Sequence, residues 1–444
     1  MKKHTAVVAV MLVLSLVFSV VAFGEPGYAY GEDELSAFAP KWNEIFTDDT
    51  VISLSVGAEA GEVRFAWLSS DGKDAAFRIS ENSDMSGAKE IAVETSDAAG
   101  DYKSNKVTVG GLEIGKTYYY SYTEKDGWSE AEPFKVQPEE NFTVLFVSDA
   151  QIGRSGEETL EEVLIRDTCG WNYTVEKMLG EYPDAAFAIS AGDQFQSPYS
   201  RTQMKAYLAP EKLRSLPMAN TIGNHDDGAT LYGDIFNNPN EVFELNADEA
   251  GTGYYYKYGD TLFITLNSNN TLLFDTARVI RKAVKAHPDA KWRVVTMHHN
   301  PYSAAFADGE YSEHRLLFSS LFDCYDIDLV LSGHDHLYSR TDIMHGGKIS
   351  DGEGTVYVQS SSASGSNYDP LPETLASHTV SAFDVRVPTY TAFTFTDDAI
   401  VGKTYRTDTD AVIDEFEISD NASDSSANIF SVVFSLLRTL FTMI

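Results

Sequence analysis

Apolar and polar positions follow two different patterns along the chain. Between residues 51 and 136, short segments alternate in polarity or are rich in β-branched and aromatic residues, and Gly, Asp and Ser turns separate them. These segments are 63–68, 76–80, 104–109 and 116–123. Several short strands at regular spacing predict a β-sandwich over residues 51–137.

A second pattern begins at residue 141. Continuous apolar runs at 142–148, 185–190, 262–266, 292–296 and 327–332 are typical of strands buried on both faces. Helix-like stretches at 174–181, 277–287 and 315–325 lie among these runs, and a β-rich tail follows at 356–359, 392–396 and 411–418. This alternation predicts an α/β domain over residues 141–418.

Polar side chains follow five of the predicted strands. They are Asp149 and Gln151 after the first run, Asp193 after the second, Asn224 and His225 after a short 218–220 segment, His298 and His299 after 292–296, and His334 and His336 after the last. In α/β sheets ligands bind beyond the carboxyl ends of strands, so these side chains are expected to converge. Carboxylate, amide and imidazole groups together favour a site for Zn, Fe or Mn.

Each of these motifs also has an ordinary structural interpretation. An Asp after a strand is usually a turn residue or a helix cap. His298 and His299 fit a strand end with one buried and one solvated ring. Only Gly-His-Asp-His is unusual by itself, because two imidazoles that follow a buried strand are costly without partners. All five motifs in this order favour a metal site.

The ordered set Asp…Gly-Asp…Gly-Asn-His…His…Gly-His-x-His resembles the calcineurin-like metallophosphoesterase family. A β-sandwich in front makes the chain most similar to the purple acid phosphatase branch. Residues 107–119 resemble the end of a fibronectin type III domain, in which Trp67 would be the core tryptophan. The resemblance spans about residues 50–418 and implies an α/β fold: a two-sheet sandwich flanked by helices, preceded by an all-β fibronectin III-like sandwich.

The resemblance also implies roles for the residues of the five motifs. Asp193 would bridge two divalent metal ions, Asp149 and His336 would hold the first, and Asn224, His298 and His334 the second. Beside this ligand set, His299, Tyr302 and Arg340 are candidates for substrate contact, and Tyr302 and Arg340, which flank ligand motifs, have packing as the alternative. His298 is preferred to His299 as a ligand because it continues directly from the strand. A hydroxide on or between the metals would attack phosphorus, and His225 would protonate the leaving oxygen or stabilise charge.

Two departures from the family pattern affect the expected metals. The first family motif, Asp-x-His, is Asp149-Ala-Gln151 here. A glutamine binds metal through its carbonyl oxygen more weakly than imidazole does, so the first position is expected to be loose or to prefer a harder ion. Purple enzymes place a metal-bound Tyr where this chain has Gln196, so no purple colour is expected. Mn, Fe(II) and Zn all stay open.

Charge narrows the classes of partner. The 444 residues include 33 Lys and Arg against 67 Asp and Glu, a net charge of −34. Such a field repels polyphosphate, which argues against nucleic-acid binding through a basic face. An anionic substrate such as a small phosphate ester would need a local positive centre, and a metal cluster supplies one.

Several other residues carry weaker expectations. Cys169 and Cys324 are expected to be buried free thiols, with a disulfide as the alternative. Asp167 and Trp171 are candidates to line the pocket. The histidines without a motif, which are expected at the surface, are His287, His314, His345 and His378.

The chain ends predict export. Lys2 and Lys3 precede an apolar run over 6–23, which is typical of a signal peptide cut after Gly24 or Ala29. We therefore assign residues 1–29 to a signal peptide, with an uncleaved anchor as the alternative, and 30–50 to a linker. After a second linker at 419–426, residues 427–444 form an apolar helix. This helix is expected to lie at a membrane surface, to bind a partner or a second copy, or to dock on its own domain.

The sequence thus predicts a secreted or cell-envelope-associated phosphoesterase with two metal ions that hydrolyses phosphate monoesters. One alternative is a phosphodiesterase or nucleotidase of the same fold. Another is a non-catalytic surface-binding protein, which Gln151 favours and His225 disfavours.

Overall fold

The computed structural model describes residues 27–48, 51–70, 75–124, 127–156, 159–246, 250–306 and 312–419. Most of the predicted signal peptide, at 1–26, and the whole predicted C-terminal helix, at 427–444, lie outside these residues. Among the helices of the described ranges, none is both long and apolar enough to span a membrane.

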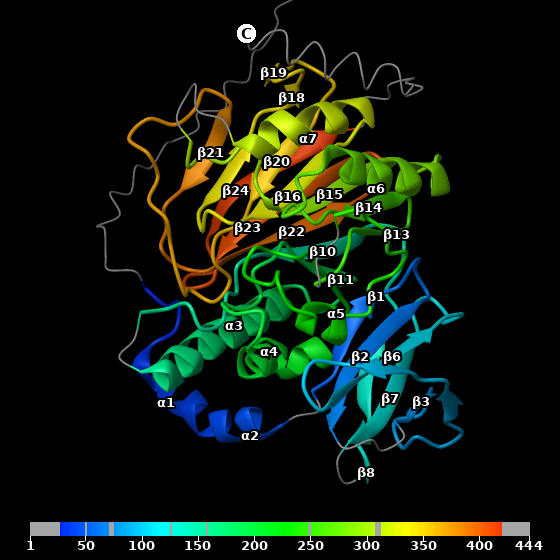
Figure 1. Ribbon diagram of the computed structural model, residues 1–444. Coiled ribbons are helices and arrows are strands. Elements are labelled where there is room, and N and C mark those ends of the chain that lie inside the picture. Colours follow the sequence, from blue (N-terminus) through cyan, green and yellow to red (C-terminus); the bar gives the residue numbers. More distant parts are fainter. Residues whose placement is uncertain are drawn as a thin grey trace, which may run out of the picture.

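Two large sheets form the centre of the molecule (Figure 1). The ten-stranded sheet has the order β24 (Val412–Ser419), β23 (Ala399–Arg406), β22 (Thr389–Phe395), β10 (Phe142–Val147), β11 (Phe187–Ser190), β12 (Met218–Asn220), β1 (Ser53–Val56), β2 (Val63–Ser70), β6 (Tyr102–Val109) and β5 (Glu94–Asp97). The seven-stranded sheet has the order β13 (Tyr254–Tyr258), β14 (Thr261–Thr265), β15 (Trp292–His299), β16 (Leu329–Gly333), β20 (Val356–Gln359), β17 (Tyr338–Thr341) and β21 (Thr379–Phe383). A hairpin of β18 (Met344–His345) and β19 (Lys348–Ile349) stands apart.

Apolar side chains fill the space between the two sheets. Val144 and Phe146 of β10 share one buried cluster with Phe263 of β14, Val294 of β15 and Leu331 of β16. These strands are the continuous apolar runs of the sequence, and both of their faces are covered. The sheet-on-sheet core therefore explains why the runs show no alternation.

Helices cover the outer faces of both sheets. The ten-stranded sheet carries α3 (Leu160–Glu181), α4 (Arg201–Leu208), η2 (Glu211–Arg214) and α5 (Leu231–Ile235), and the seven-stranded sheet carries α6 (Leu273–Ala286) and α7 (Glu313–Cys324) (Figure 1). Thr159 begins α3 with a reciprocal capping box to Glu162. The predicted fold class, a two-sheet sandwich flanked by helices, is confirmed. Neither Cys169 nor Cys324 forms a disulfide, as predicted, but only Cys169 is buried, so the prediction of burial is wrong for Cys324 at the end of α7.

The N-terminal sandwich is joined to the α/β domain through a shared sheet. Its second layer contains β3 (Phe77–Ser80), β4 (Lys89–Ile91), β7 (Thr117–Glu124), β8 (Gly127–Trp128) and β9 (Glu132–Lys135). Trp67 is fully buried in the core of this sandwich, as predicted. Strand β1 pairs in parallel with β12, with Ser55 opposite Met218. The sandwich is therefore an extension of the central sheet.

The described part of the predicted linker, residues 30–48, is largely helical. The segment contains α1 (Glu32–Phe38), η1 (Ala39–Lys41) and α2 (Trp42–Thr47), and α1 packs against α3. The Tyr30 hydroxyl donates to the carbonyl of Arg166 at 2.9 Å, and the Gly27 amide donates to that of Arg386 at 3.3 Å. These packed helices replace the predicted linker. A signal-peptide cut after Gly24 preserves both hydrogen bonds, whereas a cut after Ala29 removes the second.

Candidate metal centre

The carboxyl ends of β10, β11, β12, β15 and β16 carry the predicted site residues. The loops after β10 and β11 are joined by backbone hydrogen bonds. The Asp149 amide donates to the Gly192 carbonyl at 3.1 Å, and the Gln151 amide donates to the Asp193 carbonyl at 2.8 Å. These bonds hold the first two motifs side by side, so the predicted convergence at the strand ends is observed.

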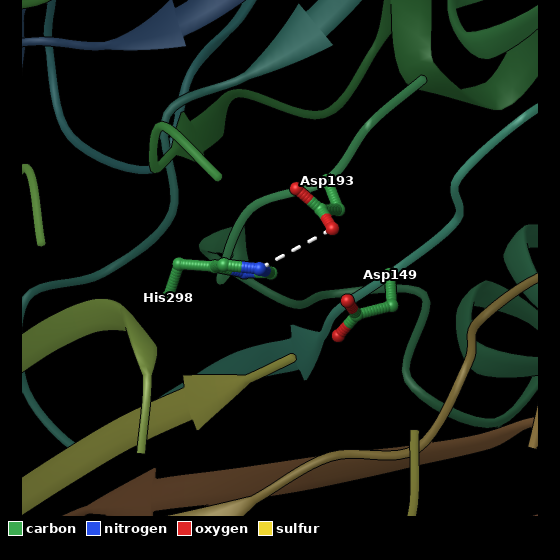
Figure 2. A group of neighbouring side chains, drawn as sticks. All are labelled: Asp149, Asp193 and His298. Atoms are coloured by element: carbon green, nitrogen blue, oxygen red, sulfur yellow. Dashed lines mark ion pairs between the residues drawn. The ribbon is translucent and has the colours of Figure 1, made fainter. Parts of the chain in front are cut away.

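Three buried side chains form the centre of this group. Ligand atoms of Asp149, Asp193 and His298 all lie within 4.8 Å of one another (Figure 2). His298 Nε2 and Asp193 Oδ2 form an ion pair at 3.3 Å. Burial by itself would raise the pKa of Asp193, but the charge of His298 and its hydrogen bond outweigh burial and lower this pKa to about 2. The same pairing overcomes burial at His298 and raises its pKa to about 10.

Ligand atoms of Asp193, Asn224 and His334 lie close to the Nε2 atom of His298. Asn224 Oδ1 lies 3.0 Å from both His298 Nε2 and His334 Nδ1. The two ring nitrogens are 3.2 Å apart, and Asp193 Oδ2 completes the group at 3.3 Å from His298 Nε2. A tetrahedral zinc ion with Zn–N bonds of about 2.05 Å separates its ligands by about 3.3 Å. The spacing of these atoms therefore fits an ion of this size.

On the other side of Asp193 the arrangement is looser and richer in oxygen. Asp149 Oδ1 lies 3.5 Å from His336 Nε2, and His336 Nδ1 lies 3.2 Å from the carbonyl oxygen of Asn367. Asp149 Oδ1 and Gln151 Oε1 are both buried without a hydrogen-bond partner in the described structure. A buried acceptor without a donor is costly, and a cation would satisfy both oxygens. The residues present therefore fit a second metal ion.

The backbone of the site is strained. Asp149, Gln151, Asp193, His334 and His336 all have positive φ, between 35° and 79°. A non-glycine residue in this region costs on the order of 1 kcal/mol or more, and such strain clusters at functional sites. The described residues include six other non-glycine positions with positive φ. Five strained residues within one predicted ligand set indicate that the fold is organised around this site.

Two motif glycines allow strands to approach the carboxylates. A Cβ at Gly223 would overlap Oδ1 and the backbone nitrogen of Asp193, and one at Gly333 would overlap Ser148 Oγ and Asp149 Oδ2. The Gly-Asn and Gly-His pairs of the sequence thus exist because a side chain at the glycine would displace the neighbouring ligand.

Replacing Gly333 with Ala is therefore expected to destabilise the protein by about 2 kcal/mol through overpacking against Ser148 and Asp149. Thermal unfolding of both proteins measures the effect. Gly180→Ala is the matched control, because a Cβ there meets nothing within 4 Å and α3 is expected to become slightly more stable. Equal melting temperatures for wild type and Gly333→Ala would contradict the close approach.

His225 lies at the rim of the site. Its amide donates to Asp193 Oδ1 at 2.9 Å, and its Nδ1 lies 3.1 Å from the carbonyl oxygen of Gln196. The side chain is half-buried, and the neighbouring Asn224 is exposed. The ring is thus held beside the centre without being part of the ligand group.

His299 lies next to the ligands in a row of imidazoles. Its ring centroid is 4.4 Å from that of His334 and 4.4 Å from that of His314, with the latter pair stacked. Its Nδ1 lies 2.8 Å from Ser268 Oγ. Burial lowers the pKa of His299, so its ring is neutral. The surface prediction for His314 and His378 is wrong, since each is only 7% exposed.

Three other predicted pocket residues have structural roles. The Arg340 guanidinium pairs with Asp414 at 2.7 Å, which supports the packing alternative for Arg340. Tyr302 is 2% exposed in the core between α7 and the seven-stranded sheet, which supports the same alternative for Tyr302. Trp171 is also a core residue, stacked on Tyr207.

Two groups outside the five motifs support the site and were not predicted from the sequence. The Ser362 hydroxyl donates to the Asp149 carbonyl at 2.9 Å and the Ser364 hydroxyl to the Ala150 carbonyl at 2.5 Å, so the serine-rich segment after β20 clamps the first motif. The buried Asp226 carboxylate accepts from the amides of Gln194 and Gly223 at 3.0 and 2.8 Å. A run of serines after an apolar strand was the available signal for the first group.

Asp167 anchors the loop beyond Gln151. Its Oδ2 accepts from the amides of Gly153, Arg154 and Ser155 at 2.8, 3.0 and 3.3 Å. Burial nevertheless raises the pKa of Asp167 to about 6. Asp167 thus anchors the loop, and burial makes the ionised form of its carboxyl group unfavourable in the folded protein.

This cost predicts a pH-dependent stability. Because the folded-state pKa of Asp167 exceeds the unfolded value, the folded state binds the proton more tightly, and this stabilisation is lost as the pH rises from about 4 to about 6. Two pKa units correspond to about 3 kcal/mol. Asp167→Asn lacks the titration, so its stability relative to wild type is expected to improve over this range in urea unfolding; Asp101→Asn, a change of the same type at an exposed position, is the control. A constant difference between Asp167→Asn and wild type from pH 4 to 7 would refute the assignment.

Comparison with known proteins agrees with this geometry. Residues 142–338 match the calcineurin-like phosphoesterase family. No curated protein matches the sequence. A solved structure of the purple acid phosphatase PPD1 from yellow lupin (Lupinus luteus) seeds is similar, with 14% identity, a TM-score of 0.65, and coverage of 86% of this chain and 78% of that one. GAP50, the anchor in the inner membrane complex of Plasmodium, aligns with 16% identity, a TM-score of 0.45, and coverage of 67% of this chain and 95% of that one.

The lupin likeness, at this low identity, shows a shared fold that includes the N-terminal sandwich. The family match covers the segment from β10 to the start of β17, which carries every predicted metal ligand. The domain that includes residues 142–338 therefore belongs to the calcineurin-like metallophosphoesterase family, in a chain with the architecture of a purple acid phosphatase.

Proposed function

We propose that this protein is a metal-dependent hydrolase of phosphate monoesters that uses two divalent ions. The observation that supports the proposal best is the convergence of Asp193, Asn224 and His334 on His298, whose Nε2 lies 3.0–3.3 Å from a ligand atom of each of the three. Two bound divalent ions would supply a nucleophile at neutral pH and neutralise the charge of the phosphoryl group. In a chain with a net charge of −34, this centre is the local positive group that an anionic ester needs.

The residues of the chain contribute position and proton transfer. The Asp193 carboxylate is held by His225 N–H and by His298, and it would be shared by the two ligand groups. The His225 ring at the rim is placed to donate a proton to the leaving oxygen, with its Nδ1 oriented by the carbonyl of Gln196. His299, fixed by Ser268, presents a neutral ring beside the ligands for contact with the ester.

Hydrolysis of an aryl phosphate monoester and of the matching diester tests the proposal. The full chain is loaded in turn with Mn²⁺, Zn²⁺ or Fe²⁺, and we expect metal-dependent turnover with a preference for the monoester. A preference for the diester would replace the monoesterase by a phosphodiesterase or nucleotidase. Absence of turnover with every metal, from folded protein, would favour a non-catalytic binding protein.

We further propose that the protein acts outside the cytoplasm, retained at the cell envelope by residues 427–444. The support is sequence pattern alone: an apolar 18-residue segment with a single Arg follows a polar stretch. Deletion of everything after Ser426 is expected to release the protein into the medium, as measured by fractionation and immunoblotting. An unchanged distribution between envelope and medium would refute retention by this segment, while deletion of only Thr442–Ile444 serves as the control.

A further inference from the structure

The two metal positions of the proposed centre are built from different atoms. The nitrogen-rich position consists of Asp193, Asn224, His298 and His334, which together offer two ring nitrogens and two oxygens. The oxygen-rich position consists of Asp149, Gln151, Asp193 and His336, which together offer one ring nitrogen and three oxygens. The difference arises because Gln151 supplies an amide oxygen.

The nitrogen-rich position is already assembled. His298 Nε2 lies 3.0, 3.2 and 3.3 Å from ligand atoms of Asn224, His334 and Asp193, and Asn224 Oδ1 lies 3.0 Å from His334 Nδ1; these distances are close to the edge of about 3.3 Å expected around tetrahedral zinc. His298 is fully buried, and its Nδ1 lies 2.9 Å from the Ala191 carbonyl oxygen, which fixes the ring. A ligand group gathered around a fixed imidazole binds zinc-like ions tightly.

The oxygen-rich position has the opposite properties. Asp149 Oδ1 and Gln151 Oε1 are buried without hydrogen-bond donors, and Asp149 and His336 stand 3.5 Å apart. The carboxyl group of Asp369 lies close enough to interact electrostatically with both His336 and Asp149. Carboxylate and amide oxygens suit Mn²⁺ or Mg²⁺ better than Zn²⁺, and these hard ions bind protein oxygens less tightly and exchange with the medium.

We infer that the centre holds two unlike ions: a tightly bound zinc-like ion in the nitrogen-rich position and an exchangeable hard cation, Mn²⁺ or Mg²⁺, in the oxygen-rich position. This inference rests on the proposed function. Its consequence is regulation, because the concentration of free hard cation around the protein sets the fraction of chains with both positions filled.

Metal stoichiometry tests the inference without any substrate. The full chain is stripped with chelator, loaded with excess Zn²⁺, desalted and assayed by elemental analysis, and we expect one zinc per chain to remain. Titration of this one-zinc protein with Mn²⁺, followed by electron paramagnetic resonance of free Mn²⁺, is expected to show one weaker site. Mg²⁺ is expected to displace the bound Mn²⁺.

Variants of Gln151 assign the two sites. Gln151→His adds an imidazole to the oxygen-rich position, so two zinc ions per chain are expected after desalting. Gln151→Leu removes the oxygen, so the Mn²⁺ affinity is expected to fall at least about 10-fold while one zinc is retained. Gln137→His, near Asp184 and away from the five strand ends, is the matched control and retains one zinc.

The outcomes separate this inference from the proposed function. Two zinc ions retained by wild type, or a Mn²⁺ affinity unchanged in Gln151→Leu, would overturn the inference and leave the hydrolase standing. A chain that binds one zinc and one manganese as expected, yet hydrolyses no phosphate ester, would support the inference and overturn the proposed function. A chain that binds no metal would overturn both.

Discussion

Replacing Asp193 with Asn is expected to abolish metal retention and to lower phosphate-ester hydrolysis by at least about 10³-fold. The substitution is nearly isosteric, but it removes the charge that pairs with His298 and that lies within 4.8 Å of Asp149 and His298 ligand atoms. Both metal positions include this carboxylate, so both lose affinity together. Elemental analysis after desalting and turnover with an aryl phosphate measure the two effects.

The control is Asp397→Asn, which changes the same type of residue at an exposed turn between β22 and β23. It is expected to keep wild-type metal content and turnover. An Asp193→Asn protein that is folded and keeps its full complement of metal would show that Asp193 is not shared between the positions.

Replacing His225 with Ala is expected to lower turnover by about 10²–10⁴-fold while metal content stays at the wild-type value. The ring lies at the rim and contacts the Gln196 carbonyl, whereas only its backbone amide reaches Asp193. The Asp193 carboxylate thus keeps its backbone donor in the variant. Turnover and elemental analysis on the same sample separate proton transfer from metal binding.

An aryl ester with a better leaving group distinguishes the role of His225. If the ring protonates the leaving oxygen, the loss caused by His225→Ala is expected to shrink as the leaving group becomes more acidic. Exposed His345→Ala is the control. A His225→Ala protein with wild-type turnover on all esters would exclude the proposed proton donor.

Asn224 and His225 are adjacent in one loop but have different roles at the site. Asn224 directs its side chain to the ligand group, and the next residue directs its amide to Asp193 and its ring to the rim. The loop keeps this arrangement because Asp226 accepts from the Gly223 amide at 2.8 Å and Gly223 leaves room for Asp193.

The sequence by itself determined the class of fold and the candidate ligand set. Continuous apolar runs such as 142–148 require strands covered on both faces, and polar residues directly after such runs are expected to converge beyond the carboxyl ends of the strands. Both conclusions rest on local pattern, so they hold without knowledge of the packing. The sandwich itself followed from the same kind of pattern, whereas the place of Trp67 in its core followed from the resemblance to a fibronectin type III domain.

The tertiary structure decided which residues near the motifs belong to the site. Arg340 and Tyr302 follow ligand motifs closely in sequence. However, Arg340 forms an ion pair with Asp414 of β24, and Tyr302 packs in the core beside α7. His314 has no motif, yet it stacks on His299. The distance of a residue from a motif along the chain does not predict which side chains it contacts, because strands and helices from distant parts of the sequence supply those contacts.

The joining of the two domains was also decided by tertiary structure. A short strand such as β1 does not specify its neighbour, because any strand edge offers the same backbone donors and acceptors. Its pairing with β12 extends the central sheet into the sandwich. In the same way, the sequence showed that Gln151 replaces an imidazole, but only the packed structure shows its oxygen buried without a donor. Local pattern selects residue types, whereas burial and partners depend on contacts between segments far apart in the chain.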